Sequence, residues 1–223
     1  MSAYFVTGSG TEIGKTYVSA AILKAARAAG RAVSASKPLM SGFTRSAIAE
    51  SDAGLLLDAC GEASTEANLA RICLHNFEEP AAPNIAARNA GVALDDDALI
   101  RFVSRSAPSS DGLHLVEGAG GVMSPATDSL LQRDLAAALG APAILVTINY
   151  LGAISHTLSA MEALDKVSVK TALVVVSQPT ADVAPPGDII PELAMWRGEP
   201  ILAAPFGIDP LSLGGDILKI LGE

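Results

Sequence analysis

Short runs of β-branched and aliphatic residues alternate along this chain with longer stretches rich in alanine and leucine, and this alternation restricts the fold more than any other feature. The runs predict strands at Ala3–Thr7, Ala32–Ser36, Leu113–Glu117, Ala143–Ile148 and Ala172–Val176, with a weaker sixth at Pro200–Ala204. Several runs are apolar at every position, as in a sheet covered on both faces. Helical patterns lie between them at Thr16–Ala29, Asp95–Arg105, Leu130–Leu139 and Ile154–Leu164. This order predicts an α/β fold with a doubly wound, mostly parallel sheet, whose ligands bind at the carboxyl ends of the strands.

Length and composition narrow the possibilities further. At 223 residues, half of them hydrophobic, the chain is long enough for one core and is interpreted as a single domain over residues 1–223. A net charge of −9 argues against nucleic acid and against an anionic membrane surface as partners. Cys60 and Cys73 form no C-x-x-C pair, and neither a basic leader nor an apolar run of bilayer length is present. These features predict a cytoplasmic protein.

A glycine-rich stretch, VTGSGTEIGKT at residues 6–16, joins the first predicted strand to the first predicted helix. It ends in Gly-Lys-Thr like a phosphate-binding loop, but Ser9 stands where the first glycine of that loop is expected. We expect backbone N–H groups to surround phosphates here, with Lys15 reaching the outer phosphates and Thr16 holding a magnesium ion. A plain strand-to-helix turn is the alternative. A dinucleotide fingerprint fits less well, because Lys37 occupies the position of an acidic ribose ligand.

Three further polar groups stand at strand ends or at a helix start. Glu117 ends the strand in LVEGAGG, on the sheet edge that carries the glycine-rich loop, and is either a magnesium ligand or a solvated glutamate. Asp52 in SDAGLLLDA suits a metal site and a helix start after Ser51 almost equally. In SKPLMSG, Pro38 fixes the direction of the chain, and Lys37 is either solvated or a second cation for phosphoryl transfer.

The motifs VTGSGTEIGKT, SKPLMSG, ESDAGLL, FEEPAAP and LVEGAGG, in this order and at these distances, resemble those of the dethiobiotin synthetase family. The resemblance runs from the N-terminus to about His156 and includes the longer count of the phosphate loop. It implies a fold of the P-loop NTPase type and a cytosolic homodimer. It also implies that diaminopelargonic acid and carbon dioxide form the cyclic urea of dethiobiotin, with ATP as co-substrate and Mg²⁺ as cofactor.

The same resemblance implies roles for individual residues. The implied catalytic residues are Lys15 and Lys37, which stabilise charge on the γ-phosphate and on a substrate carbamate. The implied nucleotide-binding residues are Glu12, Ile13, Gly14, Lys15, Thr16, Ser177 and Pro205. The implied substrate-binding residues are Thr11, Ser41, Gly118, Leu151, Gly152 and Ala153, of which the last three act across the dimer interface. The implied magnesium ligands are Thr16, Asp52 and Glu117.

The chain departs from the family pattern after His156. Ser177 follows the strand Ala172–Val176, at a position where the better-known members of the family have an asparagine that hydrogen-bonds adenine. A serine hydroxyl cannot reproduce both the donor and the acceptor of an amide. We therefore predict weak discrimination among nucleoside triphosphates.

Two other classes of protein share parts of this pattern. A nucleotide-switched ATPase that positions proteins or loads metals has a related fold, but such switches generally carry a lysine early in the loop, where this chain has Ser9 and Gly10. Amide-forming ligases with similar loops are a variant of the synthetase interpretation. A nicotinamide-dependent oxidoreductase has no need of Lys15 and Thr16. The three histidines show no metal-ligand spacing, so no metal role is predicted for them.

Overall fold

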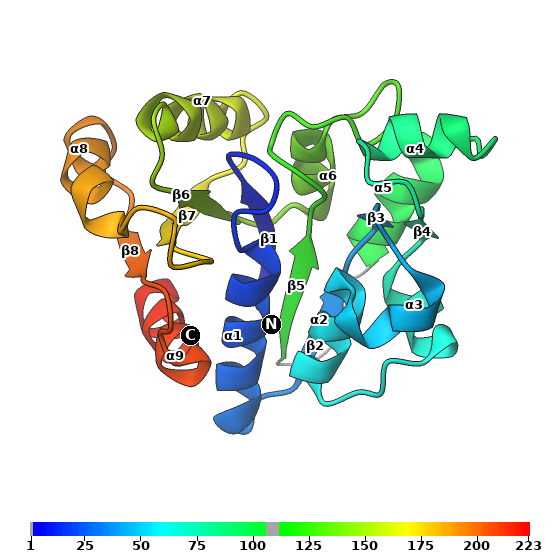
Figure 1. Cartoon of the computed structure of the whole chain (residues 1–223), viewed down its shortest axis with the longest axis horizontal. Helices are drawn as coiled ribbons and strands as arrows, with labels where there is room; N and C mark the ends of the chain where they lie inside the picture. Colours follow the sequence, from blue (N-terminus) through cyan, green and yellow to red (C-terminus); the bar gives the residue numbers. More distant parts are fainter. Residues whose placement is uncertain (1, 106–111) are drawn as a thin grey trace.

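A six-stranded parallel sheet forms the centre of the molecule (Figure 1). The computed structural model describes residues 2–105 and 112–223. In spatial order the strands are β2 (Val33–Ser36), β5 (Leu113–Glu117), β1 (Ser2–Gly8), β6 (Ala143–Ile148), β7 (Thr171–Ser177) and β8 (Ile201–Ala204). Every neighbouring pair is parallel. All six strand predictions are confirmed, and so is the doubly wound α/β architecture.

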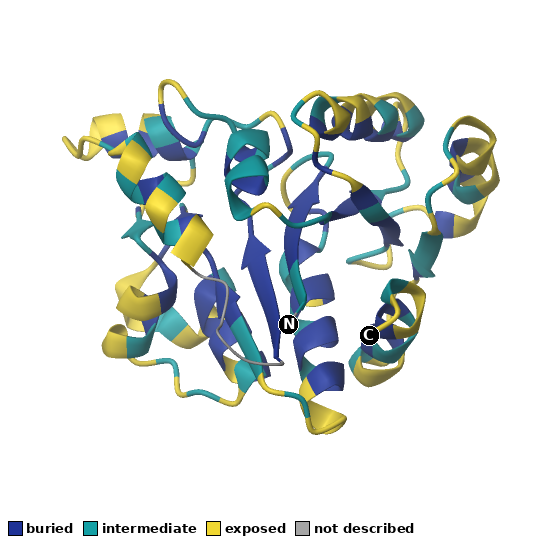
Figure 2. Cartoon of the chain, turned by 180° about the vertical axis from the view of Figure 1, so that it is seen from behind, coloured by how far each residue is buried: buried dark blue, intermediate teal, exposed yellow. Residues whose placement is uncertain are grey.

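Helices cover both faces of this sheet. They are α1 (Lys15–Ala28), α2 (Asp52–Cys60), α3 (Glu66–Ile72), α4 (Pro83–Asn89), α5 (Asp96–Arg105), α6 (Gln132–Leu139), α7 (Ala153–Asp165), α8 (Ile189–Trp196) and α9 (Pro210–Leu221), with short 3₁₀ helices η1 (Arg45–Glu50) and η2 (Pro186–Asp188). On one face, α1 and α9 bury Val18 and Leu213 in a single apolar cluster. On the other face, α5 and α6 bury Leu99 and Leu135. Figure 2 shows the central strands almost wholly buried, whereas the helices are buried mainly on one side.

The ends of the predicted helices follow local signals in the sequence. Gly30 and Gly140 come after α1 and α6 with φ of +80° and +68°, the left-handed conformation in which a glycine commonly ends a helix. Ser51 caps α2, because its Oγ accepts a hydrogen bond from the backbone N–H of Gly54 at 3.1 Å. The predicted ends are therefore correct to within two residues in each case.

Other elements were not predicted from the pattern. They are the helices α3, α4, α8 and α9 and the short parallel pair β3 (Leu39–Met40) and β4 (His75–Asn76). Helix α9 contains Gly214 and Gly215, which lower its intrinsic helix propensity. Gly214 lies directly against α1, where an added Cβ would stand 2.1 Å from the carbonyl oxygen of Ala21. The close packing of α9 against α1 therefore accounts for this helix, whereas its local helix propensity does not.

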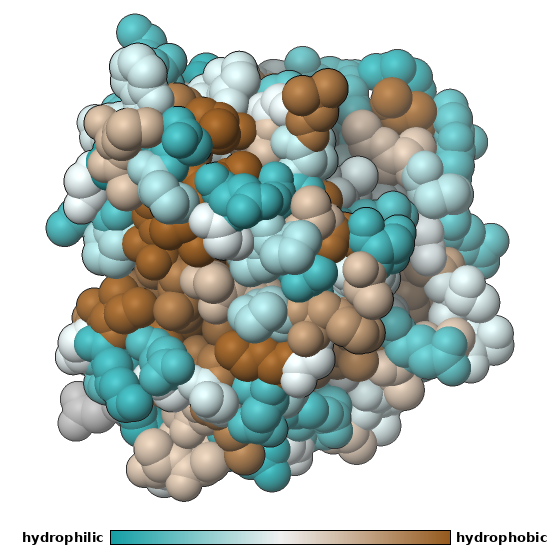
Figure 3. Space-filling view, turned by 60° about the vertical axis from the view of Figure 1, so that its left-hand side comes forward, coloured by the Kyte–Doolittle hydropathy of each residue, from teal (hydrophilic) through white to brown (hydrophobic). Residues whose placement is uncertain are grey.

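The side of the molecule formed by α8 and α9 exposes several apolar side chains, among them Met195, Trp196, Leu211 and Ile220. Figure 3 turns this side forward and shows hydrophobic surface lying between hydrophilic side chains. Within residues 2–105 and 112–223, no helix combines the length and the apolar character needed to cross a bilayer.

Candidate active site

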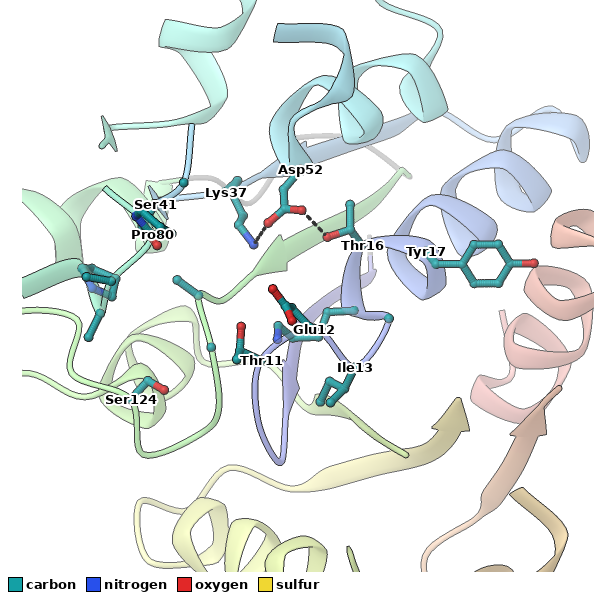
Figure 4. A pocket seen from close by; sticks show the side chains of 18 residues that line it. Thr11, Glu12, Ile13, Thr16, Tyr17, Lys37, Ser41, Asp52, Pro80 and Ser124 are labelled. Atoms are coloured by element: carbon teal, nitrogen blue, oxygen red, sulfur yellow. Dashed lines mark hydrogen bonds and ion pairs between the residues drawn. The ribbon is translucent and has the colours of Figure 1, made fainter. Parts of the chain in front are cut away.

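A cavity of about 780 Å³ lies beside the phosphate loop, at the edge of the sheet where β1, β2 and β5 end (Figure 4). The predicted site residues that line it are Thr11, Glu12, Ile13, Gly14, Lys15, Thr16, Lys37, Ser41 and Asp52. Glu117 is joined to this group through hydrogen bonds to Thr16 and Lys37. The carboxyl end of a parallel sheet is where ligands of such folds bind, so the position agrees with the expectation from the sequence.

The phosphate loop owes its shape to its glycines. Gly14 caps α1 with a φ of +88°, and Glu12 is also left-handed, with a φ of +55°. Gly8 makes room for the side chain of Ile13, since an added Cβ would lie 2.3 Å from its Cδ1. The glycine one place early therefore has a packing role within the longer loop. The N-terminal N–H groups of α1 have no partners within the helix and can receive phosphate oxygens.

A hydroxyl and two carboxylates meet at the start of α1. Thr16 Oγ1 lies 2.9 Å from Asp52 Oδ1 and 2.7 Å from Glu117 Oε1. Its single hydrogen has to be shared between the two carboxylates. Ser19 of α1 donates to Glu117 Oε2 at 2.7 Å, and Glu117 is completely buried. The three oxygens form a group with more acceptors than donors, which suits a cation.

Lys37 supplies a cation to this group in the structure. Its ammonium Nζ donates to Glu117 Oε1 at 2.7 Å, to Asp52 Oδ2 at 2.8 Å and to the carbonyl oxygen of Gly118 at 3.1 Å. The backbone holds the residue in place, since the N–H of Lys37 donates to the carbonyl of Ile72 at 2.8 Å. Lys37 is 2% exposed, so the predicted alternative of a solvated lysine is wrong.

Burial and neighbouring charge alter the acidity of these groups. Burial, and after it the ammonium of Lys37, lower the pKa of Lys15 to about 8, and the carboxylates of Glu117 and Asp52 partly oppose this shift. Burial also acts to lower the pKa of Lys37, but the carboxylates of Glu117 and Asp52 outweigh it and raise that pKa above its usual value. Burial disfavours the charge of Asp52, yet Lys37 holds the pKa of this carboxyl below its usual range. Lys37 is therefore an ammonium ion throughout the physiological range.

The second lysine lies on the phosphate loop itself. The Nζ of Lys15 donates to the carbonyl oxygen of Gly10 at 2.9 Å, and the side chain is 7% exposed. Lys15 and Lys37 line the same cavity although they are 22 residues apart in sequence. Two ammonium groups thus line one cavity beside the free N–H groups of a helix, which can receive phosphate oxygens, and one of the two, Lys37, is already paired with Asp52 and Glu117.

The residues of this site also fit a magnesium ion. No cluster of three or more histidine, cysteine, aspartate or glutamate side chains occurs in the described parts of the chain. The donor set around Thr16 consists of hard oxygens from one hydroxyl and two carboxylates. Magnesium prefers such oxygens and usually takes its remaining ligands from water and from phosphates.

The glycine-rich stretch after β5 packs against the phosphate loop. An added Cβ at Gly121 would lie 3.2 Å from the backbone N of Gly10 and 3.2 Å from the backbone O of Gly8. An added Cβ at Gly118 would lie 3.1 Å from Phe5 Cε1 and 3.0 Å from Gln132 Oε1. Within the described structure, the small size of these residues serves contacts between protein segments. Gly118 reaches the site through its carbonyl, which Lys37 binds.

Some predicted residues do not line the cavity. Ser177 lies beneath the phosphate loop, where an added Cβ at Gly14 would be 2.6 Å from its Oγ, and it is 2% exposed. Pro205 is exposed after β8. The segment 151–153 starts α7, with Leu151 fully exposed and Gly152 at a φ of +101°. In the structure of one chain none of these residues lines the cavity, although Ser177 packs against Gly14 of the phosphate loop.

Other lining residues were missed among the predicted site residues. They are Tyr17, Gly42, Pro80, Ala81, Ala82, Pro83, Ala119, Gly120 and Ser124. The residues at 80–83 belong to the FEEPAAP motif, so the motif was a signal even though no chemistry was assigned to it. Figure 4 shows Tyr17 pointing away from the site toward α9, and its hydroxyl donates to Ile208 O at 2.6 Å.

Comparison with known proteins agrees with the geometry. A family described as an AAA domain matches residues 2–204. An ATP-dependent dethiobiotin synthetase BioD of Phenylobacterium zucineum is 48% identical over 208 residues, which cover 92% of this chain and 89% of that protein. The protein of the same name from a Caulobacter species is 45% identical over 209 residues, covering 93% of this chain and 89% of the relative.

Solved structures support the fold alone. The MinC:MinD cell division protein complex of Aquifex aeolicus has a chain with a TM-score of 0.53 and 12% identity, covering 97% of this chain and 86% of that one. The cell division protein FtsY of Thermotoga maritima has a TM-score of 0.52 and 14% identity, covering 100% of this chain and 69% of that one. The fold is therefore an α/β domain of the P-loop NTPase type. The identity, the coverage and the phosphate-loop site together show that the chain belongs to the ATP-dependent dethiobiotin synthetase family.

Proposed function

We propose that this chain closes the cyclic urea of dethiobiotin from diaminopelargonic acid and carbon dioxide, through a carbamate and a carbamic-phosphoric anhydride, while ATP is cleaved to ADP and phosphate. The observation that carries the proposal is the convergence of the Lys15 and Lys37 ammonium groups with the hydroxyls of Thr11 and Ser41 on one cavity. Phosphoryl transfer depends on positioning and charge stabilisation and needs no covalent nucleophile.

The proposed steps balance without an added oxidant or reductant. One substrate amine adds to carbon dioxide and loses a proton, which gives a carbamate. A carbamate oxygen attacks the γ-phosphorus of ATP, the bond to the β-phosphate oxygen breaks, and ADP leaves. The second amine then attacks the carbamoyl carbon, phosphate leaves, and the loss of a proton completes the ring. Negative charge develops at each stage, on the carbamate and on the phosphoryl oxygens.

The chain's own residues match these charges. We assign Lys15 to the outer phosphates and Lys37 to the carbamate and the transferring phosphoryl group. Thr11 and Ser41 orient the carbamate with their hydroxyls, and Gly118 borders the substrate beside Lys37. Thr16, Asp52 and Glu117 would hold Mg²⁺, which neutralises charge on the phosphates when it is bound.

The remaining family expectations are proposals of the same kind. Leu151, Gly152 and Ala153 at the start of α7 would receive the distant carboxylate of the substrate from a neighbouring subunit, because a helix start offers free N–H groups. This role requires a homodimer. Leu151 is fully exposed in the single chain, as a residue that acts on a partner has to be. The cytoplasm stays the predicted location.

In this proposal, the protein has fewer specific contacts for the base of the nucleotide than for its phosphates. The nucleotide-binding assignment comprises Glu12, Ile13, Gly14, Lys15, Thr16, Ser177 and Pro205. Ser177 is buried, and the amide of Gln178 is already used by Val183 O at 2.7 Å and by the N–H of Phe206 at 3.1 Å. We therefore expect turnover with ATP, CTP, GTP and UTP at equal low concentrations to differ by less than about tenfold. A preference for ATP above about a hundredfold would show that other groups recognise the base.

One assay tests the proposed reaction. Phosphate release is measured with ATP alone, with diaminopelargonic acid plus bicarbonate, and with each addition singly, and dethiobiotin is identified by mass spectrometry. Release that requires both additions and equals the amount of dethiobiotin supports the proposal. Release that ignores both additions contradicts it and favours a nucleotide-switched ATPase.

A further inference from the structure

A second cavity, of about 510 Å³, lies between the edge strand β2, its neighbour β5 and helix α5. Its described lining residues are Ser34, Ala35, Ser36, Arg71, Ile72, Leu74, Ala98, Arg101, Phe102, Arg105 and His114. None of these residues lines the candidate active site. We refer to it as the β2-edge pocket.

Arginines are the only residues of permanent charge among the described lining residues of the β2-edge pocket, in an otherwise acidic protein. Three arginines line it, and its described lining residues include no aspartate or glutamate, although the whole chain carries a net charge of −9. Arg71 pairs with Glu62, and Arg101 lies 3.8 Å from Asp95. Arg105 makes no ion pair with any residue that the structure describes. Guanidinium groups can bind carboxylates and phosphates in a bidentate manner, so this lining suits an oxyanion.

A buried imidazole that lines the same pocket has one nitrogen without a partner among the described residues. His114 is 2% exposed, and its Nδ1 lies 2.8 Å from Ser34 Oγ. Its Nε2 has no hydrogen-bond partner in residues 2–105 and 112–223. Buried polar atoms without a partner are uncommon in folded proteins and call for an explanation. When the Ser34 hydroxyl donates to Nδ1, the neutral ring carries its hydrogen on Nε2 and offers it as a donor.

The edge of the sheet supplies a further donor. The backbone N–H of Lys37 points away from β5, because it donates to Ile72 O at 2.8 Å. Backbone groups alternate in direction along a strand, so the N–H of Ala35 faces the same side. Arginine side chains, an imidazole and an edge amide thus surround one space, and its other described lining residues are Ser34, Ser36 and apolar residues.

We propose that the β2-edge pocket binds a small oxyanion, a phosphate or a carboxylate group, between the guanidinium groups of Arg71, Arg101 and Arg105 and the imidazole of His114. The ligand is a small molecule and not a nucleic acid, since the rest of the chain is acidic. This site is separate from the proposed reaction, so either proposal can fail while the other stands.

The histidines allow a direct test by proton NMR. The chain has three histidines, none of which lines the active site, and the imidazole resonance of His114 is assigned by its loss in His114→Gln. Inorganic phosphate and, separately, succinate are titrated into the full-length protein at constant ionic strength, with chloride as the reference ion. We expect a saturable shift of the His114 resonance with phosphate, succinate or both, and the two titrations distinguish the two kinds of oxyanion.

Variants separate the pocket from other binding sites. Arg101→Ser and Arg71→Ser should each raise the midpoint of the titration about tenfold or more, the loss expected for one charge-assisted hydrogen bond. Arg88→Ser is the matched control, because Arg88 is an exposed arginine that pairs with Asp128 on another part of the surface. Lys15→Ala should leave the titration unchanged, which shows that phosphate bound at the active site is not its cause.

Two results would overturn the proposal. One is a His114 resonance that moves no more with about 50 mM phosphate or succinate, about fifty times a midpoint of 1 mM, than it does with chloride. The other is an equal response in wild type and in the Arg71→Ser and Arg101→Ser variants. Both arginines are exposed, and thermal unfolding of each variant confirms that the fold is intact.

Discussion

The neighbouring strands β2 and β5 carry a polar site on each face of the sheet, and the two sites differ in how their charges are matched. Toward α1, Lys37 and Glu117 stand at the strand ends and are bonded to each other, and in addition Lys37 donates to Asp52 and Glu117 accepts from Thr16. Toward α5, Ser34 and His114 are paired in register near the starts of the same strands. There one nitrogen of the imidazole has no partner among the residues that the structure describes.

The difference follows from the alternation of side chains along a strand. Leu113 and Leu115 belong to the cluster under α1, whereas Val116 belongs to the cluster under α5. Glu117 therefore faces the phosphate loop and His114 faces the opposite side. Two buried polar groups only three residues apart consequently meet different partners. The fully paired site stabilises charge, and the incompletely paired site costs stability when a proton has to be accommodated.

The largest effect is expected for Lys37→Met. This variant removes the cation from the paired site, so turnover should fall by about 10²–10³-fold, as it commonly does on loss of one preorganised charge-stabilising group. Lys24→Met on the exposed side of α1 is the control and should retain full turnover. Steady-state phosphate release measures both.

Folding has to be separated from catalysis for Lys37→Met. Glu117 would be left completely buried without its cation, which destabilises by about 3–5 kcal/mol in comparable buried pairs. The double variant Lys37→Met/Glu117→Gln removes both charges and should recover much of that stability without recovering turnover. Recovery of turnover in the double variant would contradict the role of Lys37 in catalysis.

The next effect is a loss of stability at acid pH, and it comes from His114 in the incompletely paired site. Burial lowers the pKa of His114 to about 4, below its ordinary value of about 6.5. Between these values the unfolded state binds a proton that the folded state does not, so the free energy of unfolding falls as pH falls. The loss from pH 6.5 to pH 4 is about 3 kcal/mol for this group. Urea unfolding at several pH values measures it.

His114→Gln provides the comparison for that measurement. At neutral pH the variant should be no more stable than wild type. Its free energy of unfolding should, however, decline less steeply between pH 6.5 and 4. Burial also lowers the pKa of His75, so a shallower slope should remain. Equal slopes in wild type and His114→Gln would show that His114 is not protonated on unfolding in this range.

A smaller change in rate is expected for Glu117→Gln. An amide is a poorer ligand than a carboxylate for a hard cation, so the magnesium concentration for half-maximal activity should rise and turnover should fall by about ten- to hundredfold. Glu162→Gln on α7 is a matched substitution outside the cavity. An unaltered magnesium titration in Glu117→Gln would remove this residue from the proposed metal site.

The smallest effects sharpen the contrast between the two sites. Ser19→Ala removes a buried hydrogen bond to the charged Glu117 and should lower the free energy of unfolding by about 2 kcal/mol. Ser34→Ala removes a bond to the neutral His114 and should cost about 1 kcal/mol. Chemical denaturation at pH 7.5 compares them. An equal or reversed order would mean that the pairing of charge does not distinguish the two sites.

Local chemistry was enough to predict the sheet and the phosphate loop. The apolar runs identify all six central strands, because a strand covered on both faces needs apolar residues at nearly every position. Gly-Lys-Thr after the first strand identifies the start of α1, because free N–H groups and a lysine at that position suit phosphates. Both signals are contained in a few neighbouring residues.

The sequence by itself therefore determined the six central strands, the helices α1, α5, α6 and α7 between them, the phosphate loop and the family. Only the tertiary structure decided whether Asp52, Lys37 and Glu117 meet, since Lys37 and Glu117 are 80 residues apart and no local pattern encodes a contact over that distance. It likewise decided that α9 is a helix despite two glycines, because α1 packs directly against one of them. The β2-edge pocket is another feature that only the tertiary structure decided. Its arginines and His114 come from separate segments, and only packing against one sheet edge gathers them, because burial and charge depend on neighbours in space and not on neighbours in sequence.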